Sequence, residues 1–476
     1  MRLLRPIITV AVTLALPLAV YSQSSAFDTE RSQRIAQWGS SVSNGTGDEL
    51  DQGGYAGRLQ DLLESRGWQL FNQSRGGDNT VSITSRFEPG DEPEPNTTYL
   101  TDVDPAYVVI GLSLGNEGIT RCRRSLMRRC TNSTEEADAI FEQFANGMQR
   151  LIRRARDAGI TPVVTLPYAR SDFSELEYAY TRQMNLLINT WDVPSVNMLG
   201  AIDDGQGRWA RGFYRDALHP NAAGHTEMFH AFVPSLFDAL AAGKPQPVKS
   251  DTNGFVRVVA DKPAPLSFKV EDTMRSFAFT FIVRVKQDGV VAGVIGRLVD
   301  HKYDVVRTSR PEIEWDSETI ELMQTDNRFQ TAIGVRSGRL IYSGSSGNHV
   351  SAPLQESSDG WHYVTLSHYV ARAETLVYVD AELVGIVAER LQPELFVLGG
   401  SGVTESPDMP ARADYREWML HRTGLNADEV IAVHNGTLLQ ASLEIYAPLS
   451  GRQFPTENSA QSLSEIEIDP SVQVVN

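Results

Sequence analysis

Short apolar runs alternate with amphipathic stretches through the first half of the chain. Continuous runs such as Tyr107–Gly111 and Thr161–Leu166 predict buried strands of a parallel sheet, because such strands are covered on both faces. Shorter strands are predicted at 35–38, 68–72 and 196–199, and helices at 55–66, 135–158, 175–190 and 224–240. This alternation from 32 to 242 predicts an α/β fold, a three-layer doubly wound sandwich with a mostly parallel sheet.

The pattern changes after a polar, Pro- and Gly-rich linker at 243–254. From 255 to 447, apolar and polar residues alternate with a period of two, as in Ser276–Val285 and Leu376–Asp380, which predicts antiparallel strands and an all-β sandwich. The remaining residues, 448–476, form a polar tail in which Ile466–Val475 suits an edge strand.

Length and charge narrow the classes of function. A chain of 476 residues exceeds one ordinary core, which agrees with two domains. The net charge of −17 argues against a nucleic-acid partner, because such proteins carry basic stripes.

The N-terminus has the pattern of a secretory signal. Arg2 and Arg5 precede an apolar run from Ile7 to Val20, and small residues follow, so residues 1–26 are predicted to be removed. The mature protein is then secreted, extracellular or periplasmic, with no integral membrane segment. In an exported protein Cys122 and Cys130, eight residues apart, predict a local disulfide.

Candidate catalytic chemistry centres on Asp216-Ala-Leu-His219. No histidine precedes His219, so an imidazole serving the first domain is His219, His225 or His230. The latter two lie within a predicted helix and are interpreted as packing or surface residues. Asp216 is placed to fix the tautomer of the His219 imidazole and to stabilise the imidazolium.

A nucleophile and oxyanion donors are expected at the carboxyl ends of other predicted strands, where doubly wound sheets form their sites. Ser41 lies in a Gly/Ser-rich turn, with Ser40 as the rival nucleophile, and its hydroxyl needs a base such as His219. Candidate oxyanion donors are the Ser41 N–H, a backbone N–H in the turn from Ser74 to Gly77, and the Asn116 amide.

These blocks resemble the SGNH (GDSL-type) hydrolase and esterase family over about 32–240. The resemblance implies an acyl-enzyme mechanism with Ser41, Asp216 and His219 as the triad. Ser41, Ser74 and Asn116 would form the oxyanion hole. Three positions depart from the family pattern: Ser40 stands where the family has Asp, Glu117 where Asp is usual, and Ser74 where the family has its oxyanion Gly. The second-block donor therefore stays open between Ser74, Gly76 and Gly77.

The second half resembles the concanavalin A-like and laminin-G-like sandwich superfamily. The segments Asp359–Leu366 and Leu376–Gly385 carry the resemblance, which implies a jelly-roll fold and a domain that binds glycan in many relatives. The sequence gives no sign of a lectin Ca²⁺ site.

The sequence therefore predicts a secreted serine esterase that removes acyl groups, acetyl by analogy, from carbohydrate. The alternatives are a lipolytic esterase for longer acyl chains, and a glycan-binding or adhesion protein with a decayed hydrolase domain. No metal or organic cofactor is expected.

Overall fold

The computed structural model describes residues 31–92, 97–120, 134–250, 254–258, 264–271, 277–286, 289–307, 316–399, 413–450 and 456–475. The predicted signal segment and the segment with Cys122 and Cys130 lie outside these residues. No helix in the described part of the chain is long and apolar enough to span a membrane.

The first domain is built on a five-stranded sheet whose order is β2-β1-β3-β4-β5 and whose pairs are all parallel. Its strands are β1 (Arg34–Gly39), β2 (Gln69–Asn72), β3 (Tyr107–Gly111), β4 (Thr161–Thr165) and β5 (Ser195–Val196). Side chains that alternate along β3 enter separate apolar clusters, Val109 on one face and Val108 on the other. The doubly wound prediction is confirmed.

Helices cover both faces of this sheet. The helical segments are α2 (Gly54–Ser65), η1 (Ile83–Arg86), α3 (Leu100–Val103), α4 (Leu114–Glu117), α6 (Thr134–Asp157), α7 (Glu175–Asn189), α8 (Leu199–Ile202), α9 (Ala222–His230) and α10 (Leu236–Ala241). Apolar residues of α2, α9 and α10 share one cluster, and those of α6 and α7 share the other. The single helix predicted at 224–240 is wrong: Pro234 lies in the break between α9 and α10, where it supplies no backbone N–H.

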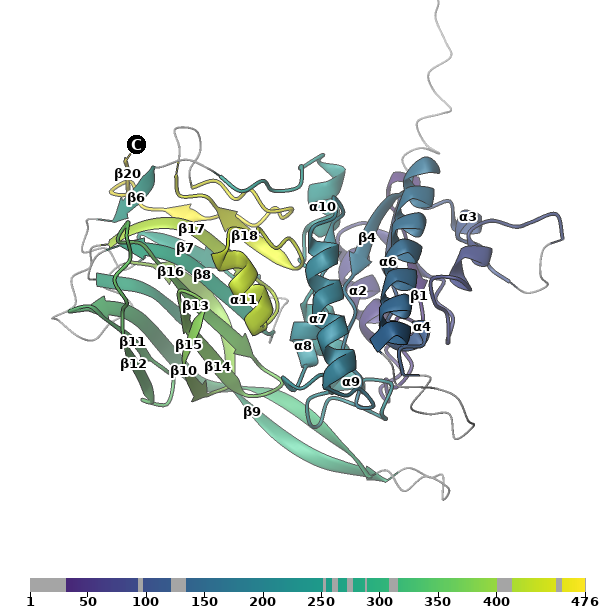
Figure 1. Cartoon of the computed structure of the whole chain (residues 1–476), viewed down its shortest axis with the longest axis horizontal. Coiled ribbons are helices and arrows are strands. Elements are labelled where there is room, and N and C mark those ends of the chain that lie inside the picture. Colours follow the sequence, from purple (N-terminus) through teal and green to yellow (C-terminus); the bar gives the residue numbers. More distant parts are fainter. Residues whose placement is uncertain are drawn as a thin grey trace, which may run out of the picture.

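The second domain packs two antiparallel sheets into a sandwich consistent with a jelly roll (Figure 1). One sheet has the order β12-β11-β10-β9-β16-β7-β19 and the other β15-β14-β13-β8-β17-β6-β20. The strands are β6 (Phe255–Val258), β7 (Leu266–Lys269), β8 (Phe279–Lys286), β9 (Gly289–Arg307), β10 (Asp316–Arg336), β11 (Arg339–Ser343), β12 (His349–Pro353), β13 (His362–Tyr369), β14 (Glu374–Val379), β15 (Glu382–Ala388), β16 (Leu391–Leu398), β17 (Ala413–His421), β18 (Leu443–Ala447), β19 (Glu467–Ile468) and β20 (Gln473–Val475). Helix α11 (Ala427–His434) follows β17.

The tail predicted at 448–476 takes part in both sheets. Strand β19 pairs with β7 and β20 pairs with β6, so the segment at 466–475 supplies an edge strand to each sheet. The Lys244 ammonium donates hydrogen bonds to the carbonyls of Asn458 (2.7 Å) and Ser462 (2.6 Å), which ties the tail to the end of the first domain.

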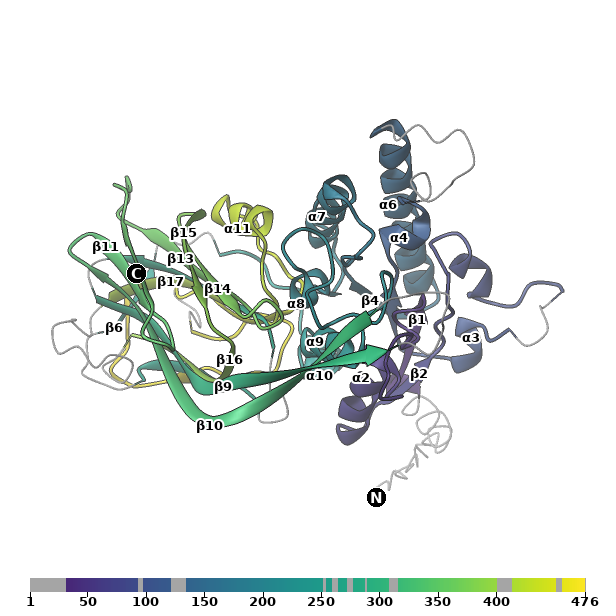
Figure 2. The same cartoon turned by 90° about the horizontal axis from the view of Figure 1, so that it is seen from below.

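Strands β9 and β10 extend beyond the sandwich as a two-stranded ribbon. We call the part from the Asp300–Met323 pair to the Arg307–Asp316 pair the arm. Figures 1 and 2 show the arm leaving the second domain and running alongside the first. Nothing in the sequence pattern predicted this extension.

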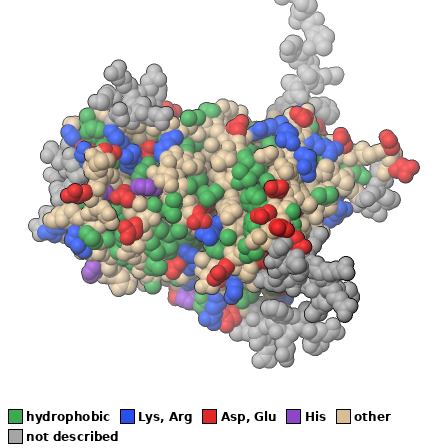
Figure 3. Space-filling view, viewed as in Figure 1, with side chains coloured by type: hydrophobic (Ala, Val, Ile, Leu, Met, Phe, Trp, Pro, Cys, Tyr) green, Lys and Arg blue, Asp and Glu red, His purple; other side chains and the backbone are tan. Residues whose placement is uncertain are grey.

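A polar interface joins the two domains. The Arg422 guanidinium is fully buried, and it donates to the His230 carbonyl (2.8 Å) and to the Glu444 carboxylate (2.8 Å). The Asn197 amide donates to Glu429 (2.8 Å), which lies in α11. Because buried polar groups need partners, these bonds fix how the domains meet. On the outer face shown in Figure 3, acidic and basic side chains are intermixed.

Candidate active site

Ser41 lies in the turn that follows β1. Gly39, the last residue of β1, pairs with Gly111 of β3, and a Cβ at Gly39 would lie 2.3 Å from the Gly111 carbonyl oxygen. Only glycine allows this approach of the two backbones. Beyond it Ser40 is fully buried, whereas Ser41 is partly exposed. Of the two candidate nucleophiles, Ser41 is therefore the one that solvent reaches.

Asp216 and His219 lie in the loop between α8 and α9. Its ends are joined by a Tyr214–Pro220 bridge and by a hydrogen bond from the Arg215 N–H to the His219 carbonyl (2.9 Å). The His219 Nε2 lies 3.1 Å from the Ser41 Oγ, and its Nδ1 lies 3.0 Å from both carboxylate oxygens of Asp216. The structure thus brings the three predicted triad residues into one hydrogen-bonded chain.

The Asp216 carboxylate is held in its charged form. Burial raises the pKa of Asp216. Hydrogen bonds from the His219 side chain and the Leu218 N–H, together with the charge of His219, lower the pKa by more, so it lies below the usual value. The Asp216 Oδ1 accepts the N–H groups of Leu218 (2.7 Å) and His219 (2.9 Å). These bonds fix the carboxylate opposite the imidazole.

The two histidines of α9, His225 and His230, are buried and have a structural role. The His225 Nδ1 accepts the Tyr55 N–H (3.2 Å) and its Nε2 donates to the Thr46 carbonyl (3.2 Å), so it joins α9 to the turn that carries Ser41. Burial lowers the pKa of His225 to about 4 and that of His230 to about 3. The sequence predicted that His225 and His230 are packing or surface residues. It did not predict that His225 links α9 to the Ser41 turn through hydrogen bonds.

The oxyanion candidates differ in how their donors are used. The Ser74 N–H donates to the Asn72 Oδ1 (3.1 Å), so this donor is already engaged. A Cβ built on Gly76 would lie 3.9 Å from the Ser41 Cβ, and within the described part of the chain the Gly76 N–H has no partner. Gly76 therefore lies beside the nucleophile with its N–H unengaged, whereas the Ser74 N–H is already bonded.

Asn116 and Glu117 follow β3 in the short helix α4. The Asn116 Nδ2 donates one hydrogen bond to the Asp78 carbonyl (3.1 Å), which leaves the second amide hydrogen for an oxyanion. Glu117 is buried and accepts from the Thr80 N–H (3.0 Å) and the Gln143 amide (2.6 Å). It stands where the resembled family has Asp, and it anchors the loop after β2.

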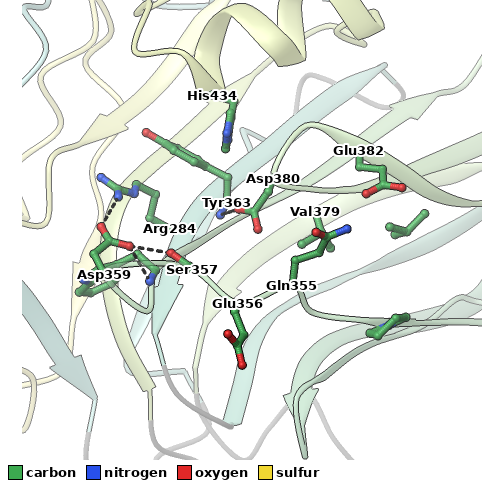
Figure 4. Close-up of a pocket in the computed structure, with 13 residues that line it drawn as sticks. Arg284, Gln355, Glu356, Ser357, Asp359, Tyr363, Val379, Asp380, Glu382 and His434 are labelled. Carbon is green, nitrogen blue, oxygen red and sulfur yellow. Dashed lines mark hydrogen bonds and ion pairs between the residues drawn. The ribbon is translucent and has the colours of Figure 1, made fainter.

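A cavity lies on the second domain, beside β13, β14 and β15. It has a volume of about 460 Å³ and mostly polar walls. In Figure 4, Asp359 accepts hydrogen bonds from Arg284 (3.3 Å) and Ser357 (2.8 Å), Glu356 lies in the same loop as Asp359, and Glu382 belongs to β15. Among the described residues no group of His, Cys, Asp and Glu has the arrangement of a metal site.

A family model matches part of the first domain. Residues 38–226 match the family model described as GDSL-like Lipase/Acylhydrolase family. No curated protein sequence matches the chain.

Solved structures match each part of the chain at low identity. A putative lipolytic protein of the G-D-S-L family from Desulfitobacterium hafniense is 14% identical, covers 42% of this chain and 97% of its own, and has a TM-score of 0.31. Axe2, an acetylxylan esterase from Geobacillus stearothermophilus, is 13% identical, with coverages of 42% and 92% and a TM-score of 0.30. A heptameric SAP-like pentraxin from Limulus polyphemus is 11% identical, with coverages of 48% and 92% and a TM-score of 0.25.

Proposed function

We propose, from the premise that residues 38–226 form a GDSL-like lipase/acylhydrolase domain, that this protein is an exported serine esterase that removes acetyl groups from carbohydrate. The observation that carries the proposal is the hydrogen-bonded chain Ser41–His219–Asp216, with distances of 3.1 and 3.0 Å.

In the proposed reaction, the Ser41 Oγ attacks the ester carbonyl while the His219 Nε2 takes its proton. The Asp216 carboxylate keeps the proton of the imidazole on Nδ1 and stabilises the imidazolium that forms. Collapse of the tetrahedral intermediate breaks the bond to the sugar oxygen, which takes the proton from the His219 imidazolium and leaves as a hydroxyl. Water then attacks the acyl-enzyme by the same steps, releasing acetate and restoring Ser41.

The negative charge of the tetrahedral intermediate needs donors that are already in place. We assign these to the N–H groups of Ser41 and Gly76 and to the free hydrogen of the Asn116 amide. Removal of one such donor from an oxyanion hole typically lowers kcat by about 10²–10³-fold. Assigning Gly76 in place of Ser74 follows from the bond that engages the Ser74 N–H.

The carbohydrate part of the proposal rests on the second domain and on the signal-like N-terminus. The cavity of Figure 4 offers carboxylates, an amide and the side chains of Tyr363 and His434, which are groups that bind sugar hydroxyls. We propose that it holds the polymer whose acetyl groups the first domain removes, as expected for a concanavalin A-like domain.

Two experiments test the proposal. A fluorophosphonate probe should label the wild-type protein and a Ser40→Ala control, but neither Ser41→Ala nor His219→Ala. An unlabelled wild-type protein would favour a glycan-binding protein with a decayed hydrolase domain, and labelling of Ser41→Ala would show that another residue is the nucleophile.

The second experiment compares acetylated oligosaccharides with p-nitrophenyl esters of increasing acyl length. The proposal predicts the highest kcat/KM for acetyl esters. An optimum at eight carbons or longer would instead identify a lipolytic esterase.

A further inference from the structure

The arm of the second domain contacts the first domain just upstream of the catalytic loop. The Ile320 N–H donates a hydrogen bond to the Gly212 carbonyl (3.1 Å), and the Arg211 guanidinium binds the Glu318 carboxylate through two bonds (2.5 and 2.8 Å). The Arg211 guanidinium also lies 5.4 Å from the ring centre of Tyr303. The arm is therefore bound to residues 211 and 212 by backbone, charge and ring contacts.

One face of the arm packs on the first domain. Ile320 pairs with Tyr303 across the ribbon, so both side chains lie on the same face. Ile320 is 4% exposed although it lies beyond the sandwich, because it joins the apolar cluster of the first domain. Gly212 has a φ of +87°, and a Cβ there would lie 2.9 Å from both the Ile320 Cβ and the Tyr303 ring. The fit between arm and loop requires glycine at 212.

The same Gly212 carbonyl also holds the end of the catalytic loop. The Asn221 Nδ2 donates to it (2.7 Å), and the Asn221 N–H donates to the Phe213 carbonyl (3.2 Å). Asn221 follows His219 by two residues, and its side chain caps α9 through the Gly224 N–H (3.0 Å). A single carbonyl oxygen thus accepts one hydrogen bond from the arm and one from the residue that anchors the His219 loop.

We propose that the arm is a positioning element of the esterase site: by holding Gly212 it fixes the His219 imidazole against Ser41, so that the second domain is required for full catalytic rate. This inference rests on the proposed function. Ile320, Glu318 and Gly212 act through His219 and do not touch substrate. A loop displacement of about 1 Å lengthens the bond from Ser41 to His219, and such misplacement lowers rates by up to about 10²-fold.

The test uses the full-length chain with Ile320→Ala and, as its matched control, Ile333→Ala. Both residues are buried isoleucines of β10, but Ile333 lies in the core of the sandwich. The inference predicts that Ile320→Ala lowers the rate of fluorophosphonate labelling and the kcat for p-nitrophenyl acetate together, by about tenfold, with KM within twofold of wild type. Ile333→Ala should lower Tm and leave both rates unchanged.

A charge exchange tests the same contact without touching a core. Arg211→Glu and Glu318→Arg should each lower the labelling rate, and the double variant should restore it, because the exchanged charges can pair again and neither side chain is buried. Wild-type labelling rates in Ile320→Ala and in both single exchanges would overturn the inference while leaving the proposed function intact. Failure of the wild-type protein to label would remove the proposed function and this inference with it.

Discussion

Replacing Asp216 by Asn isolates the charge of the proposed triad from its geometry. In the wild-type protein, the Asp216 Oδ1 accepts the N–H groups of Leu218 (2.7 Å) and His219 (2.9 Å). Asn retains this Oδ1, so the loop keeps its shape. Its Nδ2 replaces one of the two oxygens that lie 3.0 Å from the His219 Nδ1. That donor favours the tautomer with its proton on Nε2, which cannot accept the proton of Ser41.

The expected loss of kcat depends on how far the Asp216–His219 pair is exposed to solvent. Opposite charges about 4 Å apart interact by about 1 kcal/mol in water and about 4 kcal/mol at an effective dielectric constant of 20. The Asp216 side chain is 48% exposed and His219 is 16% exposed, so a value near the middle, about 2–3 kcal/mol, applies after screening by solvent. At about 1.4 kcal/mol per tenfold, kcat falls about 30–150-fold.

The assay is kcat for p-nitrophenyl acetate between pH 5 and 8. The pKa of Asp216 lies below its usual value, so the wild-type carboxylate is ionised throughout this range, and its contribution is lost only as pH falls through that lowered pKa. At pH 8 the ratio of wild-type to Asp216→Asn rates should therefore be about 30–150. A ratio near one at pH 8 would refute the assigned role of Asp216.

Three further predictions concern the oxyanion hole and the domain interface. Asn116→Ala should lower kcat by about 10²–10³-fold with little change in Tm, whereas Ser74→Ala should leave kcat unchanged. Arg422→Ala leaves the buried Glu444 carboxylate unpaired and should lower the free energy of unfolding by about 3–5 kcal/mol, measured by urea denaturation. Burial raises the pKa of Glu429 to about 8, so the folded state holds its proton and loses stability as pH rises from 4.5 towards 8. The difference in unfolding free energy between wild type and Glu429→Gln should shift in favour of Gln by up to about 1.4 kcal/mol per pH unit in that range, and a flat difference would contradict the raised pKa.

The sheet of the first domain was predictable because its signals are local. Continuous apolar strands and helical periodicity gave β3 and β4 within a residue of their bounds. Parallel strands place their carboxyl ends along one edge, so Ser41, Asn116 and His219 were expected to converge although they are distant in sequence. The division of the predicted final helix into α9 and α10 was missed, since the apolar period continues across Pro234.

Features that depend on contacts between distant segments were not predictable. The engagement of the Ser74 N–H follows from the Asn72 amide, whose orientation is set by a bond of its Nδ2 to the Ser43 carbonyl (2.9 Å). Likewise, His225 has helical spacing typical of a packing residue, and its bonds to Tyr55 and Thr46 arise only when α2 and α9 meet. The arm depends on a long pairing of β9 with β10 and on burial of Ile320 in the apolar cluster of the first domain. Neither contact can be read from the local sequence pattern.

The interface between the domains determines how the proposed glycan site can serve the esterase site. If the second domain moved freely on its linker, its charged side chains would be in contact with water. The Arg422 guanidinium is instead buried between the His230 carbonyl and Glu444, so the two domains are held together. Uncoupling the domains would break the bond from Arg422 to the His230 carbonyl and expose Ile320, which contacts the first domain from the arm. The cavity of Figure 4 and Ser41 are therefore held at a fixed separation. On the proposed function, a polymer bound in that cavity would present to Ser41 only ester groups at a set distance along its chain, and the second domain would then determine which acetyl group is removed.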